Sequence, residues 1–420
     1  MKILVVVHDY LPAHLGGSEL HAHQTAVELA RRGHEVTALF TERDLSAEQG
    51  ELRRGELDGV ATIEAVHQRE YEDVRETWVQ ARSAEVLDRV LDELRPDVVH
   101  FHHLALWGSR CLRVAREAGC RVLLTLHDYH LVCDRATLLR SDGELCTGGP
   151  TGDCTDCLRD HPLLPERHPG GAHRTPEALL ALAAIARREQ HANDLASVRR
   201  VICPSRFLAD LFVEAELLRP EQVVVLEAGY PGPRREPRPA PPADGPATPL
   251  RVGYVGGIYP SKGLHVLVDA MGHLRDAPVE LHVHGILDWF PDYVDALRRA
   301  ATGLPVHFHG RFEPARLDDV LAGVDVLVVP SVWYENMPIT IQEAFRNGLP
   351  VVTTDLGGMA EAVEHGVSGL TFPRGDARAL ADRLRALASD RALLARLAAG
   401  RPPITTLEEV VDELERLYAP

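Results

Sequence analysis

Short apolar runs alternate with amphipathic segments through the N-terminal half of the chain. The runs at 3–7, 35–40, 98–102 and 121–126 are typical of buried strands, and the segments at 19–32, 83–94 and 109–118 are typical of helices. Regular alternation of strands and helices indicates parallel strands joined by right-handed crossovers. This half is therefore predicted to form a doubly wound α/β domain.

The same alternation begins again after a proline-rich segment. Eight prolines and few apolar residues lie between Pro231 and Pro249, which indicates a stiff, extended linker. Further strands and helices are predicted at 251–255, 264–274, 280–284, 306–309, 317–322, 326–329 and 376–388. The predicted domains are residues 1–230 and 250–403, with a linker at 231–249 and a last helical segment at 404–420.

Composition and charge narrow the class of protein. The 420 residues suffice for two domains, and 45% hydrophobic and 25% charged residues allow each to bury a core. A net charge of −17 argues against a nucleic-acid binder. No signal-peptide pattern and no run of ~18 apolar residues are found, so we expect a cytoplasmic protein. The apolar stretch 178–186, followed by Arg187 and Arg188, leaves open a peripheral contact with the inner face of the membrane.

Two glutamates carry the most specific chemistry. Glu335 and Glu343 flank the start of a helix that is predicted to follow the buried run 326–329. Asn336 is predicted to cap this helix, and Pro338 to lie in its first turn. Backbone N–H groups of residues 337–340 would then form an anion site between the two carboxylates. Such a site suits a ligand with a central diphosphate and hydroxyl-rich ends, as in a nucleotide sugar.

Several motifs occur along the chain in an order that resembles one known family. They are Glu335 and Glu343 with Ala344-Phe345, Gly348 to Val352, Gly357-Gly358 with Glu361, the loop 255–263, Gly16-Gly17-Ser18-Glu19, Leu126-His127-Asp128 and the strand 201–205. The set resembles the retaining glycosyltransferases of family 4, which have the GT-B fold. The resemblance implies two Rossmann-like domains that face each other across a cleft, with the helix at 404–420 crossing back to the N-terminal domain.

The resemblance also implies roles for individual residues. The implied catalytic residues are His127 and Glu335, and the implied donor-binding residues are Gly16, Gly17, Lys262, Asn336, Met337, Pro338, Ile339, Thr340 and Glu343. Glu343 would bind the ribose diol, Glu335 would contact hydroxyls of the donor sugar, and Lys262 would reach the terminal phosphate. No catalytic metal is expected. His8, His14, His21, His23, His102, His103 and His130 crowd the N-terminal half, and several are expected to line the acceptor side.

One position departs from the family pattern. The family has an arginine five residues before the lysine of the phosphate loop, whereas this chain has Gly257. One of the two cations expected to bind the diphosphate is then missing, or another residue supplies it. Arg311 and Arg206 are the candidates.

Four cysteines fall in one glycine-rich loop at residues 133–157. Cys133, Cys146, Cys154 and Cys157 have the spacing C-x12-C-x7-C-x2-C, which favours a structural zinc site that would order the loop. Free thiols and a redox pair are the alternatives.

The sequence therefore predicts a retaining glycosyltransferase. It would move a sugar from a UDP- or GDP-sugar to a hydroxyl of a glycan, a lipid-linked acceptor or a small molecule, in polysaccharide, glycoconjugate or natural-product biosynthesis. A nucleotide-sugar 2-epimerase is the first alternative, and it needs an acidic cluster in the N-terminal domain that the sequence does not reveal. A catalytically weakened nucleotide-sugar-binding protein is the second, supported by Gly257.

Overall fold

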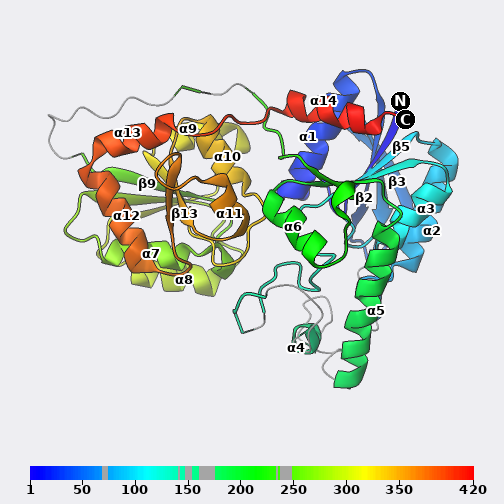
Figure 1. Ribbon diagram of the computed structural model, residues 1–420, viewed down its shortest axis with the longest axis horizontal. Coiled ribbons are helices and arrows are strands. Elements are labelled where there is room, and N and C mark those ends of the chain that lie inside the picture. The colour runs from blue at the N-terminus through cyan, green and yellow to red at the C-terminus, as the bar shows by residue number, and fades with distance from the viewer. Residues whose placement is uncertain (69–73, 141, 147–153, 160–175, 233–234, 237–247) are drawn as a thin grey trace. The chain divides into compact units, whose positions relative to one another are not determined.

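The computed structural model describes the chain except residues 69–73, 141, 147–153, 160–175, 233–234 and 237–247 (Figure 1). The described residues divide into two compact units. Unit 1 comprises Met1–Pro231 together with Leu407–Pro420, and unit 2 comprises Gly232–Thr406. Each unit is a parallel sheet covered by helices, as the two alternating patterns predict.

Unit 1 is built on an eight-stranded sheet with the order β3-β4-β2-β1-β5-β6-β7-β8. Its strands are β1 (Lys2–Val6), β2 (Glu35–Glu42), β3 (Leu52–Leu57), β4 (Val60–Val66), β5 (Val98–Phe101), β6 (Arg121–Thr125), β7 (Arg200–Cys203) and β8 (Val223–Val225). Its helices are α1 (Gly17–Arg31), α2 (Ala81–Leu94), α3 (Arg110–Glu117), α4 (Cys154–Arg159), α5 (Glu177–Leu195), α6 (Arg206–Glu214) and α14 (Leu407–Tyr418). Only the β3–β4 pair is antiparallel among the described strands of this sheet.

The β3–β4 hairpin is a part of unit 1 that the sequence analysis did not predict. Asp58 and Gly59 form its turn, with φ values of 50° and 81°. Two consecutive positive φ values match the twist of the paired strands, and Asp-Gly is a favoured sequence for such a turn. The hairpin was missed because β3 is mostly polar and exposed, so it lacks the apolar run of a buried strand.

Unit 2 is built on a six-stranded parallel sheet with the order β11-β10-β9-β12-β13-β14. Its strands are β9 (Leu250–Val255), β10 (Val279–His284), β11 (Val306–Gly310), β12 (Val326–Val329), β13 (Val351–Thr354) and β14 (Gly369–Phe372). Its helices are α7 (Leu264–Gly272), α8 (Pro291–Ala300), α9 (Leu317–Ala322), α10 (Ile339–Arg346), α11 (Gly357–Ala362), α12 (Ala377–Ser389) and α13 (Arg391–Ala399). One apolar core joins β9, β10 and β12 to α7 and α12.

The last helix, α14, is part of the core of unit 1, where it lies along α1 (Figure 1). Val411, Leu414 and Tyr418 are almost fully buried in the same cluster as Ala26 and Leu29 of α1. Polar contacts border this apolar seam, because the Arg32 guanidinium donates to Asp412 at 2.6 Å and to Glu415 at 2.9 Å. The chain therefore returns to unit 1 after completing unit 2.

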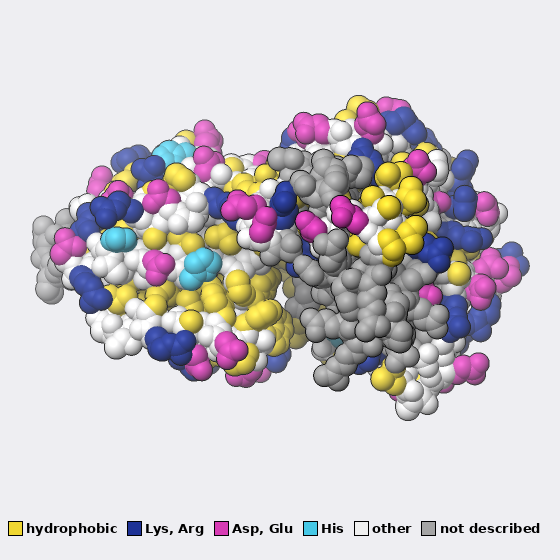
Figure 2. Space-filling view, turned by 90° about the horizontal axis from the view of Figure 1, so that it is seen from below, with side chains coloured by type: hydrophobic (Ala, Val, Ile, Leu, Met, Phe, Trp, Pro, Cys, Tyr) yellow, Lys and Arg dark blue, Asp and Glu magenta, His cyan; other side chains and the backbone are white. Residues whose placement is uncertain are grey.

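Charged side chains of both signs are interspersed over the face shown in Figure 2. Among the described residues, no helix is long and apolar enough to cross a membrane.

The packing of α14 generates a stability prediction. Leu414→Ala removes a buried side chain from the shared cluster and is expected to lower the free energy of unfolding of unit 1 by about 2–4 kcal/mol. Glu413→Ala, on the solvent side of the same helix, is expected to cost less than about 0.5 kcal/mol. Urea denaturation followed by circular dichroism measures both. Equal stability of the two variants would show that α14 adds nothing to the core of unit 1.

Candidate functional site

Two loops of unit 2 meet at the carboxyl edge of its sheet. The strands β9 and β12 are neighbours and run parallel, so the segments after them emerge side by side. The amide of Val332 donates to the carbonyl of Ser261 at 2.9 Å. Gly263 has a φ of 71°, and a Cβ there would lie 1.9 Å from the carbonyl oxygen of Pro330. This glycine is required because the two backbones touch.

The carboxylate of Glu335 is held in place by the contact between these loops. Its Oε1 accepts from Lys262 Nζ at 2.7 Å, from Ser331 Oγ at 2.7 Å and from Trp333 Nε1 at 2.8 Å. The Glu335 side chain is only 8% exposed. Its second oxygen, Oε2, accepts no hydrogen bond from the residues that the structure describes. The site therefore holds a fixed carboxylate with one oxygen available to a ligand.

Lys262 is the cation of this site. Its ammonium lies 5.8 Å from the centre of the Tyr259 ring and 5.6 Å from that of the Trp333 ring, close enough for cation–π attraction. Burial opposes its charge, but the carboxylate of Glu335 outweighs burial and raises the pKa of Lys262. The lysine is thus positively charged at neutral pH. With its side chain 25% exposed, it is also within reach of a ligand.

The helix after Glu335 begins later than the sequence analysis predicts. Pro338 is the N-cap residue and α10 starts at Ile339, so the predictions of Asn336 as the cap and of Pro338 in the first turn are wrong. The segment before the helix instead packs against α11, where a Cβ on Gly358 would lie 1.4 Å from the Asn336 carbonyl oxygen. This contact holds Asn336 and its neighbours in a non-helical path. Glu343 lies half-buried in the second turn of α10.

Gly257 leaves the loop 255–263 without an arginine. The Tyr254 hydroxyl donates to the Gly257 carbonyl at 2.7 Å, and this hydrogen bond restrains the loop. A Cβ on Gly257 would lie 2.6 Å from the Tyr259 ring, so a larger residue would have to displace that ring. Arg311, one substitute cation suggested by the sequence, is exposed just after β11. Arg206, the other, is the first residue of α6 in unit 1.

Three histidines of unit 1, two of them buried and His127 half-buried, form a compact group. His102 and His127 follow the neighbouring strands β5 and β6, and their Nδ1 and Nε2 atoms are 3.2 Å apart. His21 projects from α1, and one ring nitrogen from each of the three lies within 4.8 Å of the others. Both ring nitrogens of His21 are buried without a hydrogen-bond partner among the described residues. Burial lowers the pKa of all three, to about 4 for His21, so they are neutral at pH 7.

A second group in unit 1 joins histidines to carboxylates. His8 Nε2 lies 3.1 Å from Glu19 Oε1, His103 Nε2 lies 2.9 Å from Asp128 Oδ2, and the two imidazole rings are 4.1 Å apart. Burial opposes ionisation of Glu19, but the contact with His8 outweighs it and lowers the Glu19 pKa to about 2. Burial likewise opposes the charge of His103, yet Asp128 raises the pKa of His103. Burial and the neighbouring His103 lower the pKa of His8, so this group combines ionised carboxylates with one histidine, His103, whose protonated form is favoured and another, His8, whose neutral form is favoured.

Gly16 and Gly17 position Glu19. Gly16 caps α1, which begins at Gly17, and the Glu19 carboxylate folds back over this end of the helix. A Cβ on Gly16 would lie 2.2 Å from Glu19 Oε2, so a side chain at this position would displace the carboxylate. The negative charge of Glu19 at a helix N-terminus is also favourable to the helix dipole.

The histidines of the N-terminal half thus separate into groups that spacing alone could not distinguish. His8, His21, His102, His103 and His130 lie around His127 and Asp128. His14 borders this group, because its Nδ1 lies 3.9 Å from Asp9 Oδ2 while its Nε2 contacts Glu42. His23 lies elsewhere and contacts Asp58. His100, which the sequence analysis did not consider, is fully buried between Tyr418 and Thr125.

Two groups of described residues have ligand atoms close enough for a metal ion: His21 with His102 and His127, and His8 with Asp9 and Glu19. The four loop cysteines do not form such a group, although they share one neighbourhood. Burial, then Asp134, and then Cys146, Cys133 and Cys157 raise the pKa of Cys154 to about 11. Because Cys133, Cys146 and Cys157 each affect the pKa of Cys154, each of them lies near Cys154.

Comparison with known proteins identifies the family. Residues 15–232 match the family model described as Glycosyltransferase Family 4, and residues 249–390 match that described as Glycosyl transferases group 1. The chain belongs to glycosyltransferase family 4. It is a glycosyltransferase, as the ordered motifs of the sequence predict.

Two curated relatives illustrate the range of similar proteins. The putative colanic acid biosynthesis glycosyltransferase WcaL of Escherichia coli (strain K12) is 34% identical over 174 residues, which is 40% of this chain and 42% of that protein. The match therefore spans less than half of this relative. Glycogen synthase of Mycobacterium tuberculosis is 25% identical over 436 aligned residues, which is 97% of this chain and 91% of that protein.

Solved structures show the same fold. Anabaena Alr3699/HepE in complex with UDP and glucose has a TM-score of 0.65 at 20% identity and covers 99% of this chain and 98% of its own. Sucrose-phosphate synthase from Thermosynechococcus elongatus has a TM-score of 0.69 at 20% identity, with the same coverage. These likenesses confirm the predicted GT-B fold with two Rossmann-like domains.

The buried histidines of this family 4 glycosyltransferase generate a pH prediction. Their pKa values in the folded state are depressed, to about 4 for His21 and about 3 for His100, so below pH ~6.5 the unfolded chain binds more protons. The free energy of unfolding is therefore expected to fall as pH falls from 6.5, by up to about 2 kcal/mol for each such histidine at pH 5. His103 contributes with the opposite sign because its pKa is raised.

Urea denaturation between pH 5 and 8 measures this slope. His100→Gln is expected to reduce the dependence on pH. Stability that stayed constant from pH 8 to 5 would contradict the interpretation of these imidazoles as neutral core residues.

Proposed function

We propose that the enzyme transfers a sugar from a nucleotide diphosphate sugar, with UDP or GDP as the nucleotide, to an acceptor hydroxyl with retention of configuration. The main support is the carboxylate of Glu335. Three donors hold its Oε1, while its Oε2 is available to accept a hydrogen bond from a ligand. The solved relative HepE has been captured with UDP-glucose, which supports this donor class.

The donor is assigned to unit 2. The Lys262 ammonium has three N–H groups and gives one to Glu335, so the others can bind the terminal phosphate. Backbone N–H groups of Met337, Ile339 and Thr340, around Pro338 at the start of α10, suit the rest of the diphosphate. Glu343 on α10 would bind the ribose diol, and Glu335 Oε2 would accept from a hydroxyl of the donor sugar.

The proposed reaction needs orientation and electrostatics more than a protein nucleophile. The leaving phosphate oxygen takes the proton of the acceptor hydroxyl on the same face of the sugar, which retains the configuration. Lys262 stabilises the charge that develops on the diphosphate. In unit 1, neutral His127 contributes a polar contact to the sugar, and Gly16 and Gly17 allow close approach of the backbone at the start of α1.

The acceptor class follows from relatives more than from geometry. The name of WcaL refers to colanic acid biosynthesis, which supports a glycan or a lipid-linked glycan over a small-molecule acceptor. Cytoplasmic location is proposed with it, because the donor would be made there. A peripheral contact with the membrane is consistent with the exposed Leu179, Leu182 and Ile185 of α5.

A 2-epimerase remains the alternative function because of one observation. The sequence reveals no acidic cluster in the N-terminal domain, yet the structure gathers Asp9, Glu19 and Asp128 in unit 1. The pKa of Glu19 and that of Asp128 are both lowered, so these carboxylates are ionised and paired with histidines. Membership of glycosyltransferase family 4 favours sugar transfer over epimerisation.

We also propose that the cysteine loop binds a structural zinc ion. Cys154 and Cys157 lie one turn apart on α4, on the same face. The backbone N–H groups of Leu138, Arg135 and Thr137 favour the thiolate form of Cys133 and act to lower its pKa. Burial nevertheless raises the pKa of Cys133, and a zinc ion would overcome that by binding the deprotonated form.

Three variants test the donor site. Lys262→Ala is expected to weaken UDP binding by about 1–3 kcal/mol, since a charge-assisted contact is lost. Glu335→Gln is expected to lower kcat by about 100-fold. UDP binding should not weaken in that variant, because Lys262 loses its competing carboxylate. Glu343→Ala is expected to raise the Kd of the donor through loss of the ribose contact.

Calorimetric titration with UDP and GDP, and product release from UDP- and GDP-sugars, measure these effects. Glu364→Gln, at an exposed position of unit 2, serves as the matched control. Unaltered UDP binding by Lys262→Ala would place the donor away from this loop. Release of free 2-epimer without transfer would favour the alternative function.

Zinc content tests the cysteine site. The purified protein is expected to carry about one zinc per chain, and Cys154→Ser with Cys157→Ser is expected to abolish it. Cys203→Ser, a buried cysteine outside the loop, is the matched control and should keep the metal. Elemental analysis of protein prepared without chelator provides the measurement. Metal retained in the double variant would point instead to His21, His102 and His127.

A further inference from the structure

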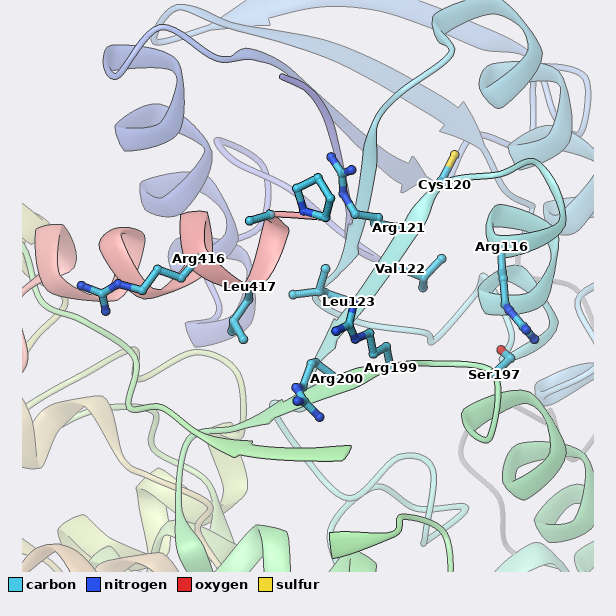
Figure 3. Close-up of a pocket in the computed structure, with 12 residues that line it drawn as sticks. Arg116, Cys120, Arg121, Val122, Leu123, Ser197, Arg199, Arg200, Arg416 and Leu417 are labelled. Carbon is cyan, nitrogen blue, oxygen red and sulfur yellow. The ribbon is translucent and has the colours of Figure 1, made fainter. Parts of the chain in front are cut away.

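A cavity of about 320 Å³ lies at the edge of the unit 1 sheet opposite the histidine groups. Arg121 and Arg200 line it, and they are the first residues of the neighbouring strands β6 and β7 (Figure 3). His127 lies beyond the other end of β6. Ligands of parallel α/β sheets usually bind at the carboxyl ends of the strands, so this cavity is separate from the proposed reaction site.

Arginines dominate the lining of this cavity. They come from the end of α3, from the start of β6, from the start of β7 and the residue before it, and from α14 (Figure 3): Arg116, Arg121, Arg199, Arg200 and Arg416. No aspartate or glutamate side chain is among the described lining residues. The Arg416 side chain extends away from the other four (Figure 3), so four arginines concentrate positive charge at this cavity in a chain of net charge −17.

Four of these arginines lack an acidic partner within the described part of the chain. Arg116 and Arg199 form no ion pair, and Arg200 donates only to the backbone carbonyl of Glu221. Arg121 Nη2 reaches only Met1 Sδ at 3.7 Å, and its Nε is buried without an acceptor. Arg416 differs, because it pairs with Glu413 at 2.6 Å.

Several arginines elsewhere in the protein, unlike these four, form ion pairs with carboxylates. Arg53 contacts Asp44, Glu51 and Glu64, and Arg251 pairs with Asp325 at 2.6 Å. No described aspartate or glutamate side chain lines the cavity, so the positive charges of its guanidinium groups have no side-chain carboxylate there to compensate them. A buried N–H without an acceptor adds a further cost. An anion in the cavity would relieve both.

We propose that this cavity binds a phosphate or diphosphate group, carried by a soluble metabolite or by a lipid head group. Guanidinium groups present paired N–H donors that match phosphate oxygens. The volume is within the range of small-molecule sites, so the phosphate can carry a further group of moderate size. Leu417 of α14 also lines the cavity, so the ligand bridges α14 to β6 and β7 and stabilises unit 1.

Titration with inorganic pyrophosphate tests the proposal on the full chain. Wild type and Lys262→Ala are expected to bind it alike at this cavity, because the donor loop is not involved. Arg116→Gln with Arg199→Gln is expected to weaken binding at least about tenfold, since two charge-assisted contacts are lost. Arg82→Gln with Arg299→Gln removes two exposed, unpaired arginines elsewhere and should bind as wild type does.

Vesicles distinguish the two sources of phosphate. Binding to phosphatidic acid vesicles but not to phosphatidylcholine vesicles, lost in Arg116→Gln with Arg199→Gln, would assign the cavity to a lipid head group. Pyrophosphate binding with no vesicle binding would assign it to a soluble ligand. The proposal is overturned if neither probe binds, if Lys262→Ala alone abolishes binding, or if the control pair weakens binding as much as the cavity pair.

Discussion

The parallel strand is the constraint on which both halves of this enzyme depend. Strands joined by right-handed crossovers all point the same way, so the segments that follow them collect at one edge of each sheet. In unit 2 this brings the loop after β9 against the loop after β12 and places Lys262 beside Glu335. In unit 1 it brings His102 and His127 together from β5 and β6. Residues far apart in the chain thus meet because of strand direction.

Electrostatic balance differs between the two assemblies. The unit 2 site pairs one cation with one carboxylate, and both are held by neighbouring donors and rings, so the proposed diphosphate would meet a preorganised charge. In unit 1, by contrast, the imidazoles of His21, His102 and His127 are neutral, because burial lowers their pKa values. Neutral imidazoles can donate to and accept from hydroxyl groups at little electrostatic cost. This division suits a reaction that develops negative charge at the donor and exchanges hydroxyl contacts with sugars.

Close backbone contacts explain why glycines recur around the sites. Gly263 and Gly358 lie where a Cβ would overlap a carbonyl oxygen, at Pro330 and Asn336 respectively. Gly16 leaves space for the carboxylate of Glu19. At these positions the family motif is a packing requirement, since each glycine lets two segments approach and fixes the side chains beside them. Gly257 is different, because only the movable ring of Tyr259 restricts its replacement.

The sequence by itself determined the α/β class, the two alternating patterns and, through its ordered motifs, the family. Those features are local: apolar runs such as Val326–Val329 and short motifs such as Gly16-Gly17 can be read without knowing their neighbours. The start of α10 was misjudged because contact with Gly358 overrides the capping preference of Asn336. Tertiary structure alone decided which histidines meet, that Glu19 and Asp128 join them, and that arginines from α3, β6 and β7 surround one cavity. These depend on which strands and helices are neighbours, and contacts between distant segments leave no periodic signal in the sequence.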